Sequence, residues 1–222
     1  MKKSLLLLLP LLLVSCLMVQ AGPCGIGTLA TYDAVGFSCT IDGLTFSNFA
    51  YSPAETGGAA VPDASGVAVT PQTTGGEVGF QFNAAWLVGP NQNEDSAITY
   101  TATCTSGTDC ITDLYLQMVG GALAPGAASV TETASNGASL FTFSQGPINI
   151  LSDTAMFSPV DSLNVQKDIA VSGGTDGAAH MSIVYNLFST TSSVPEPALA
   201  AFCAGMLFLI PVARRRFPRW RM

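Results

Sequence analysis

The fold of this chain is decided by the stretch Cys39-Thr-Ile-Asp-Gly-Leu-Thr-Phe-Ser-Asn-Phe-Ala-Tyr51. Asp42-Gly43, near its centre, favours the tight two-residue turn of a β-hairpin. On both sides of this turn, aromatic or branched residues alternate with small or polar ones, as in strands that bury one face. The stretch therefore predicts a hairpin of two strands, at residues 35–41 and 44–51.

The same pattern continues to residue 191. Each further segment is bounded by Gly, Pro, Asn or Asp, and no amphipathic helix of ten or more residues is evident between them. About ten short strands in one domain of about 170 residues indicate an all-β fold, a single β-sandwich or jelly roll. The longest loops are expected at residues 52–65 and 121–126. The other strands are expected at residues 66–70, 78–87, 97–104, 111–119, 129–133, 140–144, 162–171 and 178–188.

Residues 1–21 have the pattern of a secretory signal peptide. Lys2 and Lys3 precede an apolar run at residues 5–14, and Val19-Gln20-Ala21 offers a small-residue cleavage site. Residues 22–191 are therefore expected to form an exported domain. In an alternative reading Cys16 closes a lipobox and carries a lipid, although the apolar stretch continues beyond this cysteine.

Residues 192–222 have three successive parts. Val194-Pro195-Glu196-Pro197 must be extended, because proline fixes φ, removes a donor and restricts the residue before it. An uncharged run of fifteen residues, 198–212, would span roughly 22 Å as a helix, against about 30 Å of hydrocarbon. Arg214, Arg215 and Arg216 then form a basic stop that places the C-terminus in the cytoplasm.

In order and spacing, these three parts resemble the sorting signal of bacterial PEP-CTERM proteins. Residues 39–52 also look like a motif of acidobacterial-type exported members of that family. The resemblance implies processing near Pro195-Glu196-Pro197 by exosortase, a membrane-embedded protease or transpeptidase. It further implies transient anchoring by the C-terminal helix, then a place at the cell surface or in an exopolysaccharide or biofilm matrix. It supplies no active site.

Four cysteines fall within the exported domain: Cys24, Cys39, Cys104 and Cys110. An even number in an exported protein indicates disulfides. Three pairings are possible, and we expect Cys24–Cys39 and Cys104–Cys110 because each closes a short local loop. A zinc site is disfavoured, since the chain has no Cys-x-x-Cys spacing and a single histidine, His180.

Charge is distributed very unevenly. All fifteen acidic residues lie between Asp33 and Glu196, whereas Lys167 is the only Lys or Arg between residues 22 and 197. One cation against fifteen acids gives this segment a formal charge of −14. Such a surface excludes nucleic-acid binding, which needs basic contacts to phosphate. The acids could simply maintain solubility, or they could attract divalent cations or cationic matrix material.

Candidates for chemistry are few, and the sequence favours a non-enzymatic protein without metal or cofactor. Paired carboxylates at Glu94-Asp95, or at Asp109 with Asp113, could serve a glycoside hydrolase, which uses two facing acids. The oxygen-rich segment 91–95 could hold calcium in an adhesin, although it lacks the spacing of an established calcium loop and also suits a turn. His180 has no partner pattern and is expected to be a surface or hydrogen-bonded strand residue.

Aromatic residues test a further alternative, a carbohydrate-binding module. Phe80, Phe82 and Trp86 have even spacing and would share one face of a strand. In a sandwich that face is expected to be core, whereas an exposed groove of aromatics would indicate sugar binding. The remaining candidates for stacking, Tyr51, Tyr100, Tyr115 and Tyr185, are dispersed in the sequence.

Overall fold

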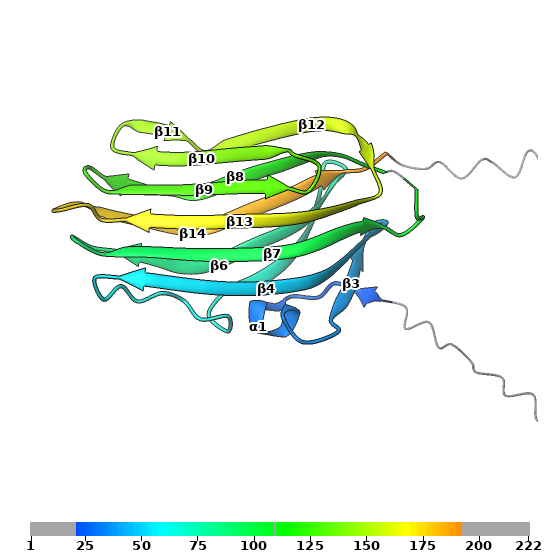
Figure 1. Ribbon diagram of the computed structural model, residues 1–222, viewed down its shortest axis with the longest axis horizontal. Helices are drawn as coiled ribbons and strands as arrows, with labels where there is room; N and C mark the ends of the chain where they lie inside the picture. Colours follow the sequence, from blue (N-terminus) through cyan, green and yellow to red (C-terminus); the bar gives the residue numbers. More distant parts are fainter. Residues whose placement is uncertain (1–20, 109, 192–222) are drawn as a thin grey trace, which may run out of the picture.

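The computed structural model describes residues 21–108 and 110–191, which form two β-sheets packed face to face (Figure 1). The all-β prediction is confirmed, and the architecture is that of a β-sandwich. Within the described residues there is one short helix, α1 (Leu29–Tyr32). The strands are β1 (Gly22–Pro23), β2 (Gly27–Thr28), β3 (Ser38–Ile41), β4 (Leu44–Thr56), β5 (Ala68–Thr74), β6 (Glu77–Val88), β7 (Asn93–Cys104), β8 (Ile111–Leu123), β9 (Ala127–Ala134), β10 (Ser139–Gln145), β11 (Ile148–Ile150), β12 (Ser152–Val160), β13 (Ser162–Ser172) and β14 (Ala178–Ser189).

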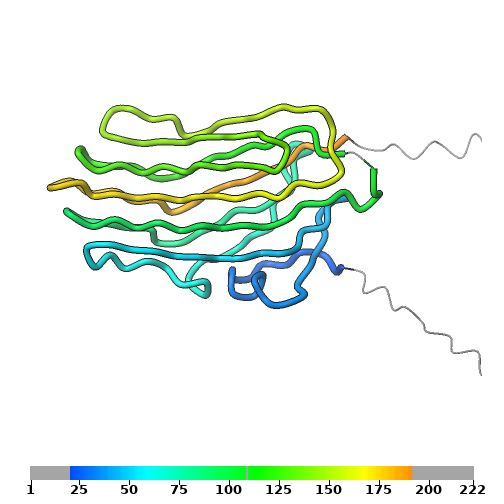
Figure 2. Tube along the Cα trace, viewed as in Figure 1, coloured from blue at the N-terminus to red at the C-terminus, as the bar shows by residue number. Residues whose placement is uncertain are grey.

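The two sheets are open and of unequal size. The larger has eight strands in the order β1-β3-β4-β7-β13-β9-β10-β11, and the smaller has six in the order β12-β8-β14-β6-β5-β2. Figure 2 shows that both ends of the described chain, near Ala21 and Thr191, lie at the same end of the sandwich. We call the opposite end the distal end; Thr56, Asn93 and Ser172 mark it, because β4 and β13 finish there and β7 begins there.

The predicted hairpin is present as β3 and β4. Asp42 and Gly43 have φ values of 38° and 91°, the left-handed conformation that a two-residue hairpin turn requires. The pairing of Ile41 with Leu44 then sets the register, so that Leu44 and Phe46 point into the core. The predicted strand at residues 35–41 is too long, because Gly36 lies in a turn and β3 begins only at Ser38.

Most other predicted strands are found, but two loops and several edge strands differ from the prediction. The expected loops at residues 52–65 and 121–126 are shorter, since β4 continues to Thr56 and β8 to Leu123. Four strands were not predicted. β1 and β2 have two residues each, too few for a pattern. β11 and β12 are edge strands in which every residue is exposed or half-buried, so they lack the apolar alternation by which a strand is recognised.

The predicted disulfides are confirmed. Cys24 bonds to Cys39, joining the first residues of the domain to β3, and Cys104 bonds to Cys110 across the β7–β8 connection. Two disulfides indicate an oxidising environment outside the cytoplasm. Residues 1–20 of the expected signal peptide, which include Cys16, lie outside the described residues, as do the 194–197 motif, the sorting helix and Arg214–Arg216.

The core contains one charged cluster among aromatic rings. Lys167 on β13 lies directly opposite Glu132 on β9, and its Nζ donates to Glu132 Oε2 at 2.5 Å. From the other sheet, Asn186 Nδ2 donates to Glu132 Oε1 at 2.9 Å, while Asn186 Oδ1 accepts from Lys167 and from the Tyr100 hydroxyl. All four side chains are buried, and the cluster joins the two sheets. We call it the core network.

Burial raises the pKa of Glu132 and lowers that of Lys167, while their mutual attraction opposes both changes. Each member therefore depends on the others for the hydrogen bonds that water would otherwise supply. The Lys167 ammonium also lies 5.3 Å from the centre of the Tyr100 ring, in cation–π range.

Replacing Lys167 alone should be strongly destabilising. Lys167→Met leaves the Glu132 carboxylate buried without its cation, so we expect a loss of about 3–5 kcal/mol in the free energy of unfolding. Lys167→Met/Glu132→Leu removes both charges and should lose less than the single variant. Urea denaturation of the three proteins measures this, and a double variant at least as destabilised as Lys167→Met would contradict the role of the pair.

Candidate functional site

The outer face of the eight-stranded sheet is the candidate site. On its four central strands, β4, β7, β13 and β9, alternate residues point away from the core, and nearly all are small or polar. We call this surface the polar face; it faces the viewer in Figure 1. Its members toward the distal end are Ala50, Ser52, Ala54, Thr56, Asn93, Asp95, Ala97, Thr99, Ala127, Ser129, Thr131, Thr133, Gln166, Asp168, Ala170 and Ser172.

Side-chain hydrogen bonds fix parts of this face across strand boundaries. Asn93 Nδ2 donates to Thr56 Oγ1 at 3.0 Å, and Ser172 Oγ donates to Asn93 Oδ1 at 2.6 Å, so three strands are linked at the distal end. Thr101 repeats the arrangement further along, donating to Asn164 Oδ1 at 2.9 Å. Side chains held in this way present an ordered array of hydroxyl and amide groups.

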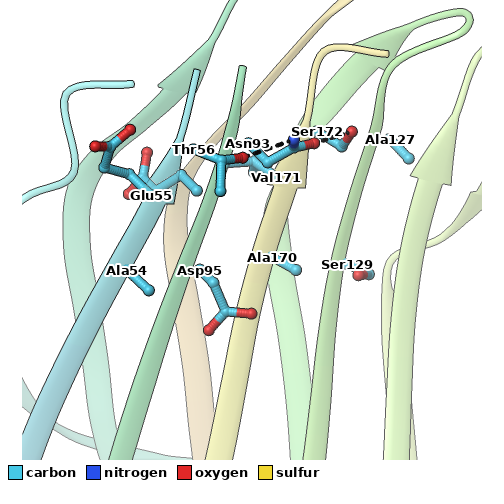
Figure 3. A pocket seen from close by; sticks show the side chains of 11 residues that line it. Ala54, Glu55, Thr56, Asn93, Asp95, Ala127, Ser129, Ala170, Val171 and Ser172 are labelled. Carbon is cyan, nitrogen blue, oxygen red and sulfur yellow. Dashed lines mark hydrogen bonds between the residues drawn. The ribbon is translucent and has the colours of Figure 1, made fainter. Parts of the chain in front are cut away.

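A shallow trough of about 250 Å³ lies at the distal end of the polar face (Figure 3). Four residues that pair in register across neighbouring strands form one row of its floor: Ala54, Asp95, Ala170 and Ser129. The linked Asn93 and Ser172 form the next row. Because the floor is built from small side chains, the Asp95 carboxylate is the main projecting charge in this row.

Asp95 is close to a second carboxylate. Asp168 is on the neighbouring strand, paired with Ala97, and therefore lies diagonally from Asp95 on the same face. Partial burial, together with the hydrogen bond and the like charge of Asp168, raises the pKa of Asp95 to about 6. The two groups form an acidic pair, with the one cation of this sheet, Lys167, on the opposite face.

A partly exposed aromatic pair adjoins the polar face: Phe141 is exposed and Phe143 is half-buried. Phe141 and Phe143 on β10 stack with ring centres 5.9 Å apart and planes inclined by 21°. Phe141 pairs with Thr131 in register and remains 45% exposed, and Phe143 pairs with Ser129. Their position was not recognised from the sequence, although Leu140 provided the signal: if Leu140 faces inward, both phenylalanines must face outward.

A buried carboxyl lies beneath the trough. Glu94 is 1% exposed, and its two oxygens have no hydrogen-bond partner of good geometry among the described residues. Burial raises the pKa of Glu94 to about 7, and the nearby backbone of Leu87 offsets only part of the rise. Two residues along β7, Ser96 accepts a hydrogen bond from Trp86 Nε1 at 3.2 Å and lies 2.9 Å from the Tyr51 hydroxyl.

The prediction that Phe80, Phe82 and Trp86 form core is confirmed. These three rings therefore do not form the exposed groove that sugar binding would need. Phe80, Phe82 and Trp86 are completely buried. Tyr100 is also buried, within the core network, and cannot stack on a ligand. The exposed aromatics are on another strand.

Glu94 and Asp95 do not form the two facing acids that the alternative of a glycoside hydrolase would need. Adjacent residues in a strand point to opposite faces, so Glu94 lies in the core and Asp95 on the polar face. Asp109 lies outside the described residues, and Asp113 accepts the backbone N–H of Ser189 at 2.8 Å. His180 is an exposed strand residue, as predicted, with Leu87 and Gly121 on either side in register.

The segment at residues 91–95 is only partly a turn. Asn91 has a φ of 59° and lies in the turn, whereas β7 already begins at Asn93. In the described part of the chain, no three His, Cys, Asp or Glu side chains are grouped so that they could hold a metal ion. Across residues 21–108 and 110–191, no helix is long and apolar enough to cross a membrane.

No family model matches this chain, and no curated protein matches it. Among solved structures, it is similar to the enzymatically active domain of tailspike protein 4 of bacteriophage CBA120, at 15% identity and a TM-score of 0.26. The match covers 64% of this chain and 19% of the tailspike chain. A likeness this low carries no argument about the polar face.

Glu94 should make the domain less stable as the pH rises. The folded protein retains the Glu94 proton up to about pH 7, while the unfolded chain releases it near the ordinary glutamate pKa. Between about pH 4 and pH 7 this difference costs the fold about 3 kcal/mol. Glu94→Gln should remove that part of the loss, which urea denaturation at several pH values measures. Asp33→Asn, at an exposed position, is the control; an unchanged pH dependence in Glu94→Gln would contradict the assignment.

Proposed function

We propose that this chain is an exported surface or matrix protein, without catalytic activity, that binds exopolysaccharide through the polar face and the Phe141–Phe143 pair. The observation that carries the proposal is the combination, on one open sheet face, of ordered hydroxyl and amide groups with two stacked rings, one exposed and one half-buried. Sugars present both hydroxyl groups and apolar C–H faces. They can therefore hydrogen-bond to the first kind of group and stack on the second.

The dimensions of the face suit a polymer better than a small molecule. Neighbouring strands are about 4.8 Å apart, so the four steps from β10 to β4 cover about 19 Å. The trough is shallow and open to the rest of the face, and its floor of Ala54, Ala170 and Ser129 leaves room for a chain lying across the strands.

Export and sorting form the other half of the proposal. The two disulfides support a place outside the cytoplasm, and the resemblance of residues 192–222 to a PEP-CTERM signal supports processing by exosortase. Before processing, the C-terminal helix would hold the protein in the membrane. The C-terminal end of the described chain lies at the end of the sandwich opposite the distal end, where the trough is (Figure 2). A protein attached through its C-terminus would therefore present the trough away from the attachment point.

Loss of the aromatic pair should strongly weaken polysaccharide binding. Phe141→Ala/Phe143→Ala removes both stacking surfaces, and we expect retention on polysaccharide from the producing culture to fall at least tenfold in affinity electrophoresis. Leu87→Ala/Leu123→Ala removes two exposed apolar side chains from the other sheet and is the matched control. Equal retention of the two variants would argue against this face, and no retention of the unaltered full-length protein would argue against polysaccharide binding altogether.

Loss of the sorting motif should leave the tail in place. We expect the unaltered protein to lose the segment after the motif and to leave the membrane fraction, because processing separates it from the helix. Pro195→Ala/Glu196→Ala/Pro197→Ala should keep its full mass and remain in the membrane. Intact mass and cell fractionation measure both. If the two proteins keep their tails alike, exosortase sorting is wrong.

A further inference from the structure

The charge of the described surface is almost entirely of one sign. Of the described acids, only Glu94 and Glu132 are buried; the others are exposed or half-buried. Lys167, the only Lys or Arg in residues 21–108 and 110–191, is completely buried in the core network. An acidic polysaccharide would therefore meet repulsion and no compensating cation, whereas a cationic one would be attracted.

The acidic pair focuses this charge at the centre of the polar face. Asp168 is in register with Thr131, and Thr131 with Phe141; Asp95 belongs to the row that contains Ser129 and Phe143. Each carboxylate thus shares a row with one ring of the aromatic pair. Asp168 is two strands from Phe141 and Asp95 is three strands from Phe143, which correspond to about 10 Å and about 14 Å. A single polymer lying across the strands could contact a ring and a carboxylate together.

A bound cation would relieve the repulsion between Asp95 and Asp168. The residues next to this pair indicate whether that cation would be a metal ion or an ammonium group. Calcium takes six to eight oxygen ligands, but Asp95 lies between Ala54 and Ala170, and Asp168 is paired with Ala97, so the nearest cross-strand neighbours supply few. A primary ammonium group needs only a few acceptors for its three N–H donors, and the two carboxylates provide them.

We propose that the polar face binds an amine-bearing polysaccharide, such as a partly de-N-acetylated hexosamine polymer, with sugar rings on Phe141 and Phe143 and ammonium groups at Asp95 and Asp168. The inference rests on the proposed polysaccharide binding and adds the chemical class of the ligand. It also gives the acidic pair a role, because ionised carboxylates facing one another are stabilised by a cation placed between them.

The test compares three probes on the full-length protein purified in detergent: chitosan oligomers, fully N-acetylated oligomers of the same length, and alginate oligomers, which are acidic. We expect chitosan to bind about tenfold more tightly than the N-acetylated oligomers, and alginate not to bind. The difference should shrink in high salt, because exposed charges are screened. Asp95→Asn/Asp168→Asn should lose the preference, so that chitosan and the N-acetylated oligomers bind this variant with similar affinity.

Asp33→Asn/Asp161→Asn changes the net charge equally at exposed positions off the polar face and should keep the preference. If this control loses it as well, general surface charge is responsible and the assignment to the acidic pair is overturned. If neutral and amine-bearing oligomers bind equally, the ligand class is wrong, while polysaccharide binding stands. If neither these oligomers nor the culture polysaccharide binds, the proposed function itself fails.

Discussion

The structure depends on the buried ion pair between Lys167 and Glu132. Lys167 is inside because its strand, β13, places Lys167 opposite Glu132 on the inner face, and Asn186 from the second sheet completes the hydrogen bonds of both. A slip of β13 by one residue would turn Lys167 outward and bury Asp168 instead. The alternative register would place an unpaired carboxylate among aromatic rings. The core network thus specifies strand register as well as joining the sheets.

The surface chemistry follows from the same register. With Lys167 inside, no ammonium or guanidinium group in the described domain remains at the surface, and the outward residues of β13 include Asp168. On β7 the alternation separates Glu94 from Asp95, leaving one carboxyl in the core and one on the polar face. The acidic pair Asp95–Asp168 therefore has no cation beside it because Lys167 is used to pair with Glu132 in the core.

Local signals were enough to predict the hairpin at Asp42-Gly43, most strands, the aromatic core at Trp86 and both disulfides, because each depends on spacing within a short segment. The burial of Lys167 could not be predicted, since lysine is ordinarily exposed and its partners lie on β9 and β14. The acidic pair likewise requires β7 to lie beside β13, a long-range pairing. Phe141 and Phe143 carried a readable alternation, but exposure on an outer face is decided only once the inner face is known.

The hydrogen bonds within the polar face would limit how tightly a single copy binds the proposed polysaccharide. Thr56, Asn93 and Ser172 already hydrogen-bond to one another, so a sugar hydroxyl exchanges one partner for another and gains little net energy. Because these side chains are already held by hydrogen bonds, however, binding would require little further ordering, and weak contacts would repeat along a polymer. Several copies on one polysaccharide would then bind far more strongly than one. A shallow face of modest affinity, if presented in many copies, would suit the proposed role in a matrix better than capture of a soluble sugar.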